Sequence, residues 1–230
     1  MPKKILATAS SLLAFILCFV LLSALFLPHL TEQRLSRNFR HYLNASSVSA
    51  DVGSKNIISL LQGHTETINI KIEAGEKSIL NISSLEASWN KSNVVLNLLS
   101  GPRLYIRDAE ANNTVIYWNN QTLAAYLNQT QNVITNISLV IGEENIAVSG
   151  RTKDGNISFN AIPKIDDYLS FELTELSLNG VSQTEEELKP YQTALTLDIK
   201  LTPLKWKIWV RQVILSEGQM KLVGSSSCCH

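Results

Sequence analysis

Cysteine is scarce in this chain of 230 residues, and the three cysteines lie outside the part that the sequence predicts to fold. Cys18 falls in an apolar N-terminal stretch, whereas Cys228 and Cys229 are adjacent near the C-terminus. No disulfide can therefore cross-link the middle of the chain, so a hydrophobic core has to stabilise it. The terminal pair could join two chains or bind a metal with His230, but we expect residues 225–230 to be a disordered tail.

The chain also lacks the motifs of the common enzyme classes. It has no G-x-S-x-G elbow, no Walker loop and no dinucleotide fingerprint. Asp166 and Asp167 are adjacent, and neighbours on a strand point to opposite faces, so we interpret them as a solvated turn rather than a catalytic pair. None of the four histidines has a metal-ligand companion at a recognised spacing: His29, His41, His64 and His230. We expect no enzymatic activity, no cofactor, no metal site and no nucleic-acid partner.

Charge is missing from Ile5 to Leu27, which as a helix would extend about 34 Å, enough to cross a hydrocarbon core. Lys3 and Lys4 precede this stretch like the start of a signal peptide, but it is longer than a typical signal core and no convincing cleavage site follows. Residues 1–30 are therefore predicted to be an uncleaved transmembrane anchor, with a cleaved signal as the alternative.

The orientation of this anchor depends on the basic residues at its two ends. Arg34, Arg37 and Arg40 follow the apolar stretch and compete with Lys3 and Lys4 under the positive-inside rule. The two lysines are closer to the stretch. We therefore expect the N-terminus in the cytoplasm and the rest of the chain outside the cell membrane.

Residues 31–45 are predicted to form a short amphipathic helix. Leu35, Phe39, Tyr42 and Leu43 recur at helical spacing, while the arginines face elsewhere. The apolar stripe of this helix could lie on the membrane surface or dock on the folded domain, and the sequence leaves both readings open.

Residues 46–224 read as a series of strands with few helices. Apolar and polar residues alternate at intervals of two along most of this region, which is the period of a half-buried strand. The sequence predicts strands near residues 48–52, 68–72, 85–89, 94–99, 104–111, 133–141, 146–152, 156–162 and 195–201. Asp154-Gly155 is a strong hairpin turn, and helices are predicted within residues 55–63, 119–129 and 182–195.

One predicted strand changes its phase. Leu169, Phe171 and Leu173 are at odd-numbered positions, whereas Leu176 and Leu178 are at even-numbered ones. In a regular strand the two groups would point to opposite faces. Such a change indicates a bulge, which bends a strand and increases its twist. We therefore predict an α+β fold in which a long, curved antiparallel sheet wraps around one or two helices, after an N-terminal transmembrane helix.

The last predicted strand has an apolar and a basic face. Trp206, Ile208 and Val210 form the apolar face. The other face would suit anionic headgroups but also suits plain solvation; it consists of Lys205, Lys207, Trp209 and Arg211.

The order of these segments resembles the LmeA family of bacterial phospholipid-binding proteins over most of Ser46 to Gly224. The resemblance is carried mainly by "LLQG" before the first long strand, the helix "TLAAYLN", and the closing "LTPLKWKIWVRQVILSEGQMKLVG". The loop "SLNGVSQTEEELKPY" departs from the proline-rich form expected in that family.

This resemblance implies a membrane-tethered, extracytoplasmic protein that binds or carries phospholipid or a related lipid for cell-envelope metabolism, in the apolar cavity of a tubular lipid-binding fold. Parity and helical faces select the residues that would line this cavity: Ile57, Leu61, Ile70, Leu127, Phe171, Ile199, Trp206 and Ile208. The same alternation also builds an ordinary filled core. An anchored scaffold that docks another envelope protein, without lipid cargo, is the alternative function, and a pseudopilin-like subunit is a weaker one.

Overall fold

The computed structural model describes residues 2–54, 59, 64–75, 78–94, 106–107, 111–165, 169–184, 186–187, 191, 200–201 and 206–228. Their contacts divide the chain into two compact units. Unit 1 contains Met1–Asn38, Ser49–Asn69 and Trp89–Ala111, and unit 2 contains Phe39–Val48, Ile70–Ser88 and Asn112–His230. The fold is sheet-rich with few helices, as the sequence predicts, and every described strand register is antiparallel.

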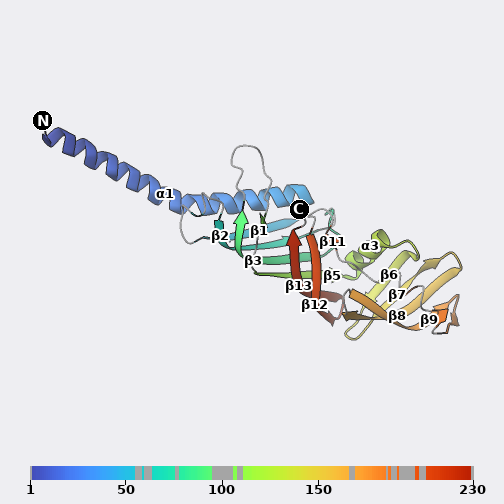
Figure 1. Ribbon diagram of the computed structural model, residues 1–230. Coiled ribbons are helices and arrows are strands. Elements are labelled where there is room, and N and C mark those ends of the chain that lie inside the picture. The colour runs from blue at the N-terminus through green and yellow to red at the C-terminus, as the bar shows by residue number, and fades with distance from the viewer. Residues whose placement is uncertain are drawn as a thin grey trace. The chain divides into compact units, whose positions relative to one another are not determined.

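The described helices are α1 (Pro2–Leu43) and α3 (Asn120–Thr130), labelled in Figure 1. The strands are β1 (Ser47–Gly53), β2 (His64–Glu73), β3 (Ser84–Val94), β4 (Ile106–Arg107), β5 (Ala111–Asn119), β6 (Thr135–Ile141), β7 (Ile146–Thr152), β8 (Gly155–Ile165), β9 (Leu169–Leu178), β10 (Val181–Ser182), β11 (Lys200–Leu201), β12 (Trp206–Ser216) and β13 (Gln219–Cys228).

These strands form two sheets rather than the single long sheet that the sequence predicts. The eight-stranded sheet has the order β1-β2-β3-β5-β13-β12-β11, with β4 paired to β3. The five-stranded sheet has the order β10-β9-β8-β7-β6. Strands that follow one another in the chain are neighbours throughout the second sheet, which is the arrangement that short hairpin connections favour.

The first 43 residues contain one helix where the sequence predicts two segments. Helix α1 continues through Pro28 to Leu43, and Asn44 ends it in the left-handed conformation, with φ of 53°. The predicted boundary near residue 30 is therefore not a break in the helix. Among the residues whose side chains the structure describes, no helix has the length and hydropathy of a membrane span.

The second half of α1 docks on folded parts of the chain, which decides between the two readings of residues 31–45. In unit 1, Leu35 is 2% exposed and the Glu32 carboxylate accepts a hydrogen bond of 3.1 Å from the Val52 backbone. In unit 2, Leu43 is fully buried and its carbonyl accepts a 3.1 Å hydrogen bond from the backbone of Ile79. Leu35 and Leu43 of the apolar stripe therefore pack against protein, whereas Tyr42 is 62% exposed.

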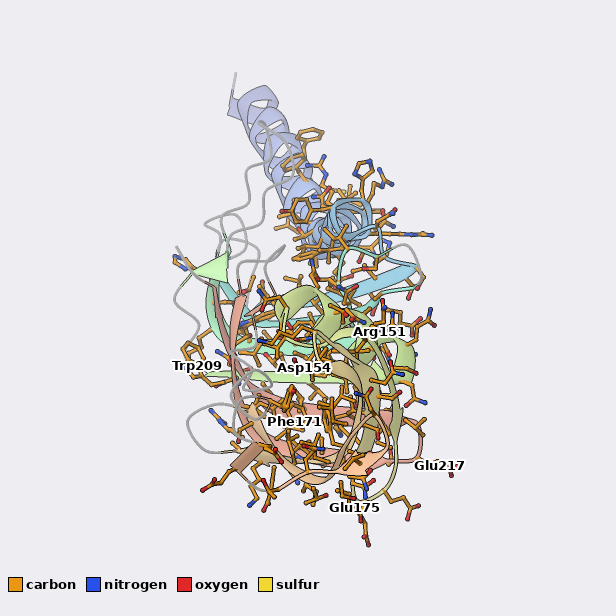
Figure 2. All side chains as sticks on the ribbon, turned by 90° about the vertical axis from the view of Figure 1, so that its right-hand side faces the viewer. Arg151, Asp154, Phe171, Glu175, Trp209 and Glu217 are labelled. Atoms are coloured by element: carbon orange, nitrogen blue, oxygen red, sulfur yellow. The ribbon has the colours of Figure 1, made fainter. Side chains whose placement is uncertain are left out.

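The bulge predicted between Leu173 and Leu176 is confirmed. Ser158 and Asn160 on β8 pair with Ser177 and Thr174 on β9, so two residues of β9 oppose one residue of β8. Glu175 has φ of 54° and projects into solvent, and Leu173 and Leu176 are both buried on either side of it. The extra residue therefore returns the apolar side chains to the buried face of the sheet, whereas Glu175 points away from it (Figure 2).

A strand was missed between two predicted elements. The prediction ends a strand at Ala111, but β5 runs from Ala111 to Asn119 and pairs with β13. Ile116 and Trp118 of β5 are fully buried. The hairpin at Asp154-Gly155 is confirmed, because Thr152 on β7 pairs with Gly155 on β8.

The prediction of a disordered tail is wrong for Ser225–Cys228. These residues belong to β13, which pairs with β12 along its length, and Ser226 is buried. Thr114 donates a hydrogen bond of 2.7 Å to the hydroxyl of Ser226, and the Ser226 backbone N–H donates one of 2.7 Å to the side chain of Asn112. Pairing with the preceding strand β12, together with hydrogen bonds to Asn112 and Thr114 of β5, orders a segment that has no strand signal of its own.

A second bulge interrupts β12 where the sequence predicts regular alternation. Val210 pairs with Gly224 and Gln212 with Val223, so Arg211 has no opposite residue. A Cβ atom at Gly224 would collide with the backbone carbonyl of Trp209, because the two strands approach closely here. Glycine at position 224 is therefore what permits the bulge.

Candidate lipid-binding interior and membrane-facing surfaces

The predicted interior residue Leu127 lies on helix α3. Asn119 caps the helix: its side chain accepts a 2.9 Å hydrogen bond from the Thr122 backbone, and the Thr122 hydroxyl accepts one of 3.0 Å from the Asn119 backbone. Leu123, Tyr126 and Leu127 are the buried residues, and their spacing puts them on one side of the helix. Leu127 is 3% exposed.

Asparagine side chains of α3 hold this helix on the edge strand β6. The Asn128 side chain accepts a 3.0 Å hydrogen bond from the Ile137 backbone and donates one of 3.3 Å to the Ile137 carbonyl. Asn120 accepts a 2.9 Å hydrogen bond from the backbone of Ile141. These amides pair with the backbone of β6 as a neighbouring strand would, so they cover this sheet edge and fix the position of Leu127.

Two further interior candidates lie on strands β9 and β12. Phe171 on β9 is 4% exposed and pairs with Pro163 on β8. Ile208 on β12 is 5% exposed and pairs with Ser226 on β13. Strand β12 of the eight-stranded sheet contacts β8 of the five-stranded sheet, and β8 pairs with β9.

Ile70 on β2 is also buried, at 2% exposed, whereas Leu127 lies on the helix that covers the β6 edge of the five-stranded sheet. The four described candidates therefore come from four different elements, and each of them is buried. Within the described residues, every buried side-chain nitrogen and oxygen has a hydrogen-bond partner. The described interior is thus apolar, with its few polar groups satisfied.

The outward face of β12 carries the predicted headgroup residues. Trp209 is 46% exposed and Arg211 is exposed, so both face solvent as predicted. In Figure 2, Phe171 lies within the packed part of unit 2 and Trp209 projects from its surface. Because of the bulge, Gln212 and Ile214 continue this outward face after Arg211.

The structure does not describe the side chains of six predicted site residues. Ile57, Leu61, Ile199 and Lys205 lie outside the described residues. Trp206 and Lys207 are in β12, but their side chains are not among those described.

Trp118 is the largest buried side chain of this interior that the sequence did not predict. The side chain is fully buried, its indole N–H donates a 2.6 Å hydrogen bond to the Asn81 carbonyl, and its ring centroid is 5.2 Å from that of Tyr126 on α3. It therefore joins β5 to α3. The run Val115–Trp118, which is apolar at both odd and even positions and lies between Thr114 and Asn119, was the available signal for a buried strand.

Among the described residues, the titratable groups with shifted pKa values are Lys71 and Glu187, which lie on the surface. The side-chain hydrogen bond of Lys71 to Glu86, across an ion pair of 3.1 Å, raises the pKa of Lys71. The backbone N–H of Thr184 donates to Glu187 and lowers the pKa of that carboxyl. Across the described part of the chain, no three His, Cys, Asp or Glu side chains are grouped as metal ligands would be.

Comparison with protein-family models, with curated proteins and with solved structures finds no significant match to this chain. The resemblance to the LmeA family therefore remains a hypothesis from the sequence.

Proposed function

We propose that this protein is a membrane-tethered, extracytoplasmic phospholipid-binding protein. The observation that carries the proposal is the exposed apolar surface of α1. Seven large apolar side chains on α1 are 49–70% exposed: Phe15, Leu17, Phe19, Leu21, Leu22, Phe26 and Leu30. Apolar surface of this extent on one helix is the kind that a lipid bilayer covers.

The gain from covering these side chains is large. Moving an exposed Leu or Phe side chain out of water is worth about 1.5–3 kcal/mol, and about half of each side chain is available, so the seven together contribute on the order of 10 kcal/mol. No charged residue occurs between Ile5 and Leu27 to oppose this transfer. We infer that the first half of α1 inserts into the membrane.

The apolar interior of unit 2 supports the proposal that the protein carries lipid. Ile70, Leu127, Phe171 and Ile208 are at most 5% exposed. An acyl chain of about sixteen methylenes gains roughly 13 kcal/mol on leaving water, and a bilayer already supplies this gain. A carrier therefore needs only an apolar interior that matches the bilayer approximately, with no reactive group.

We further infer that the sheets curve, with α3 covering the β6 edge of the five-stranded sheet. The register shifts on β6, β9 and β12 each add a residue to one strand, and such bulges bend strands and increase their twist. Sheets that bend in this way can separate enough to admit acyl chains between them.

Phospholipid transfer between liposomes tests this proposal. The full chain is expected to accelerate the movement of a fluorescent phospholipid from donor to acceptor vesicles. Ile208→Asn should lower this rate roughly tenfold, because a polar group in an apolar site is costly without a partner. Ile214→Asn is the matched control: the same change on the same strand, at a side chain that is 40% exposed.

Circular dichroism restricts the comparison to folded variants, and the wild-type chain decides the proposal by itself. A folded wild-type chain that transfers no phospholipid would show that cargo binding is wrong. The anchored scaffold would then be the better account.

A further inference from the structure

The second half of α1 has a basic side that faces away from the protein. Arg34, Arg37, Arg40 and His41 are exposed, whereas Thr31, Leu35 and Leu43 on the other side are buried. Arg34, Arg37 and His41 are three and four residues apart, so they lie on one face of the helix. We name Arg34, Arg37, Arg40 and His41 the basic stripe.

The basic stripe continues the apolar surface of the first half of α1. Its positions extend the series Phe15, Phe19, Leu22, Phe26 and Leu30, which also advances by three or four residues at each step. All five of these apolar side chains are about half exposed or more. One side of α1 therefore changes from apolar to basic in the turn after Pro28, which lies inside the helix.

The acidic residue of this segment faces the other way. Glu32 is the one carboxylate between Pro28 and Leu43 in the sequence. It is half-buried, it accepts a hydrogen bond of 3.1 Å from the Val52 backbone, and it lies 3.7 Å from His29. Between Pro28 and Leu43, the side of the helix that carries the basic stripe therefore has no carboxylate of its own.

We propose that the basic stripe lies on the anionic headgroups of the membrane that receives the apolar half of α1. This proposal rests on the proposed tethering, and it adds the class of lipid that the protein prefers. Basic segments beside a membrane insertion are attracted to anionic lipids, and guanidinium groups bind phosphate through paired hydrogen bonds. The consequence is that α1 beyond Pro28 rests on the bilayer surface, and the lipid charge fixes the orientation of this half.

Fluorescence quenching in liposomes tests the contact. A headgroup-sensitive fluorophore is attached at Gln33→Cys, an exposed position beside the basic stripe, in the full chain with Cys18, Cys228 and Cys229 replaced by serine. Quenchers on the lipid headgroups then report how close the helix lies to the surface. In vesicles of phosphatidylcholine and phosphatidylglycerol, quenching should be about threefold stronger than in phosphatidylcholine alone. About 1 M salt, where the Debye length is about 3 Å, should remove the difference.

The triple variant R34Q/R37Q/R40Q should reduce quenching in the anionic vesicles to the level seen in neutral ones. The control R151Q/K153Q/K221Q removes the same number of positive charges from positions outside α1 and should leave the quenching unchanged. Arg151 and Lys153 are exposed, and Lys221 is half-buried over the Tyr117 ring. Equal quenching in both kinds of vesicle, or no effect of the first triple variant, would overturn the proposal. Binding of an RNA probe that depends on these arginines, without any dependence on lipid charge, would also overturn it.

The outcome is separable from that of the transfer assay. A chain that transfers phospholipid but shows no dependence on lipid charge disproves the basic-stripe contact alone. A chain whose quenching follows lipid charge but which transfers no phospholipid disproves cargo binding alone.

Discussion

Replacing Phe19 and Leu22 together by glutamate is expected to release the chain from membranes. Both side chains lie on the exposed series along α1 and are 64% and 50% exposed. The double variant loses the transfer gain of two apolar side chains and places two charges where the bilayer should lie. Each charged side chain costs about 2.5–3.5 kcal/mol in such a position, so the membrane partition should fall by about four orders of magnitude or more.

Flotation of the full chain with liposomes measures this effect. The wild-type chain should float with the lipid, and the Phe19→Glu, Leu22→Glu variant should stay in the soluble fraction with an unchanged circular dichroism spectrum. The matched control exchanges the two side chains, Phe19→Leu with Leu22→Phe, and keeps the apolar area. If the glutamate variant floats as well as the wild type, then α1 is not the tether.

Trp118→Ala should produce the largest loss of folding stability. The side chain is fully buried, packs 5.2 Å from the Tyr126 ring, and donates a hydrogen bond to Asn81. Removing a buried Trp side chain costs about 3–5 kcal/mol, a large part of the total stability of a domain. The free energy of unfolding, measured by urea denaturation, should fall by about 4 kcal/mol.

Trp209→Ala is the control for this change, because Trp209 is 46% exposed on β12. Its loss should cost less than about 1 kcal/mol, as is usual for surface positions. Trp118→Phe separates packing from hydrogen bonding: it keeps an aromatic ring and leaves the Asn81 carbonyl without its donor, at a cost of about 1–3 kcal/mol. Equal losses for the two alanine variants would contradict the placement of Trp118 in the core.

The bulges show how far the sequence pattern can predict the sheets. On β9 the parity change between Leu173 and Leu176 was visible because the outward residues are polar, and the predicted bulge is present at Glu175. On β12 the inward-facing residues also change from even-numbered positions, such as Ile208, to odd-numbered ones, such as Val213. There the outward face carries Trp209 and Ile214, and these apolar residues hid the change.

The sequence pattern does not predict elements whose structure depends on contacts with other segments of the chain. Ser225–Cys228 has no apolar alternation, and it is a strand because β12 pairs with it. Whether the apolar side of residues 31–45 contacts the membrane or the folded protein is likewise decided by contacts with other segments. The hydrogen bond between Val52 and Glu32 is one of them. Propensity and period describe single segments, whereas these features arise from tertiary pairing.

The candidate interior was predictable in part. Parity and helical spacing correctly selected Ile70, Leu127, Phe171 and Ile208 as buried residues. Trp118 was missed because its strand is apolar on both faces near its end, and a run of this kind has no period to detect. The alternation of apolar residues in the sequence is the same whether their buried side chains contact protein or bound lipid. The crosslinking experiment below distinguishes the two.

Photo-crosslinking tests the central claim, that phospholipid occupies the interior, most directly. The full chain is incubated with liposomes that contain a phospholipid with a photoactivatable group in its acyl chain, irradiated, digested and analysed by mass spectrometry. The account predicts lipid adducts on peptides of α3, β9 and β12 that contain Leu127, Phe171 and Ile208, in addition to adducts on α1. Adducts confined to α1, with none on those three peptides, would contradict it and identify the protein as a membrane-anchored scaffold.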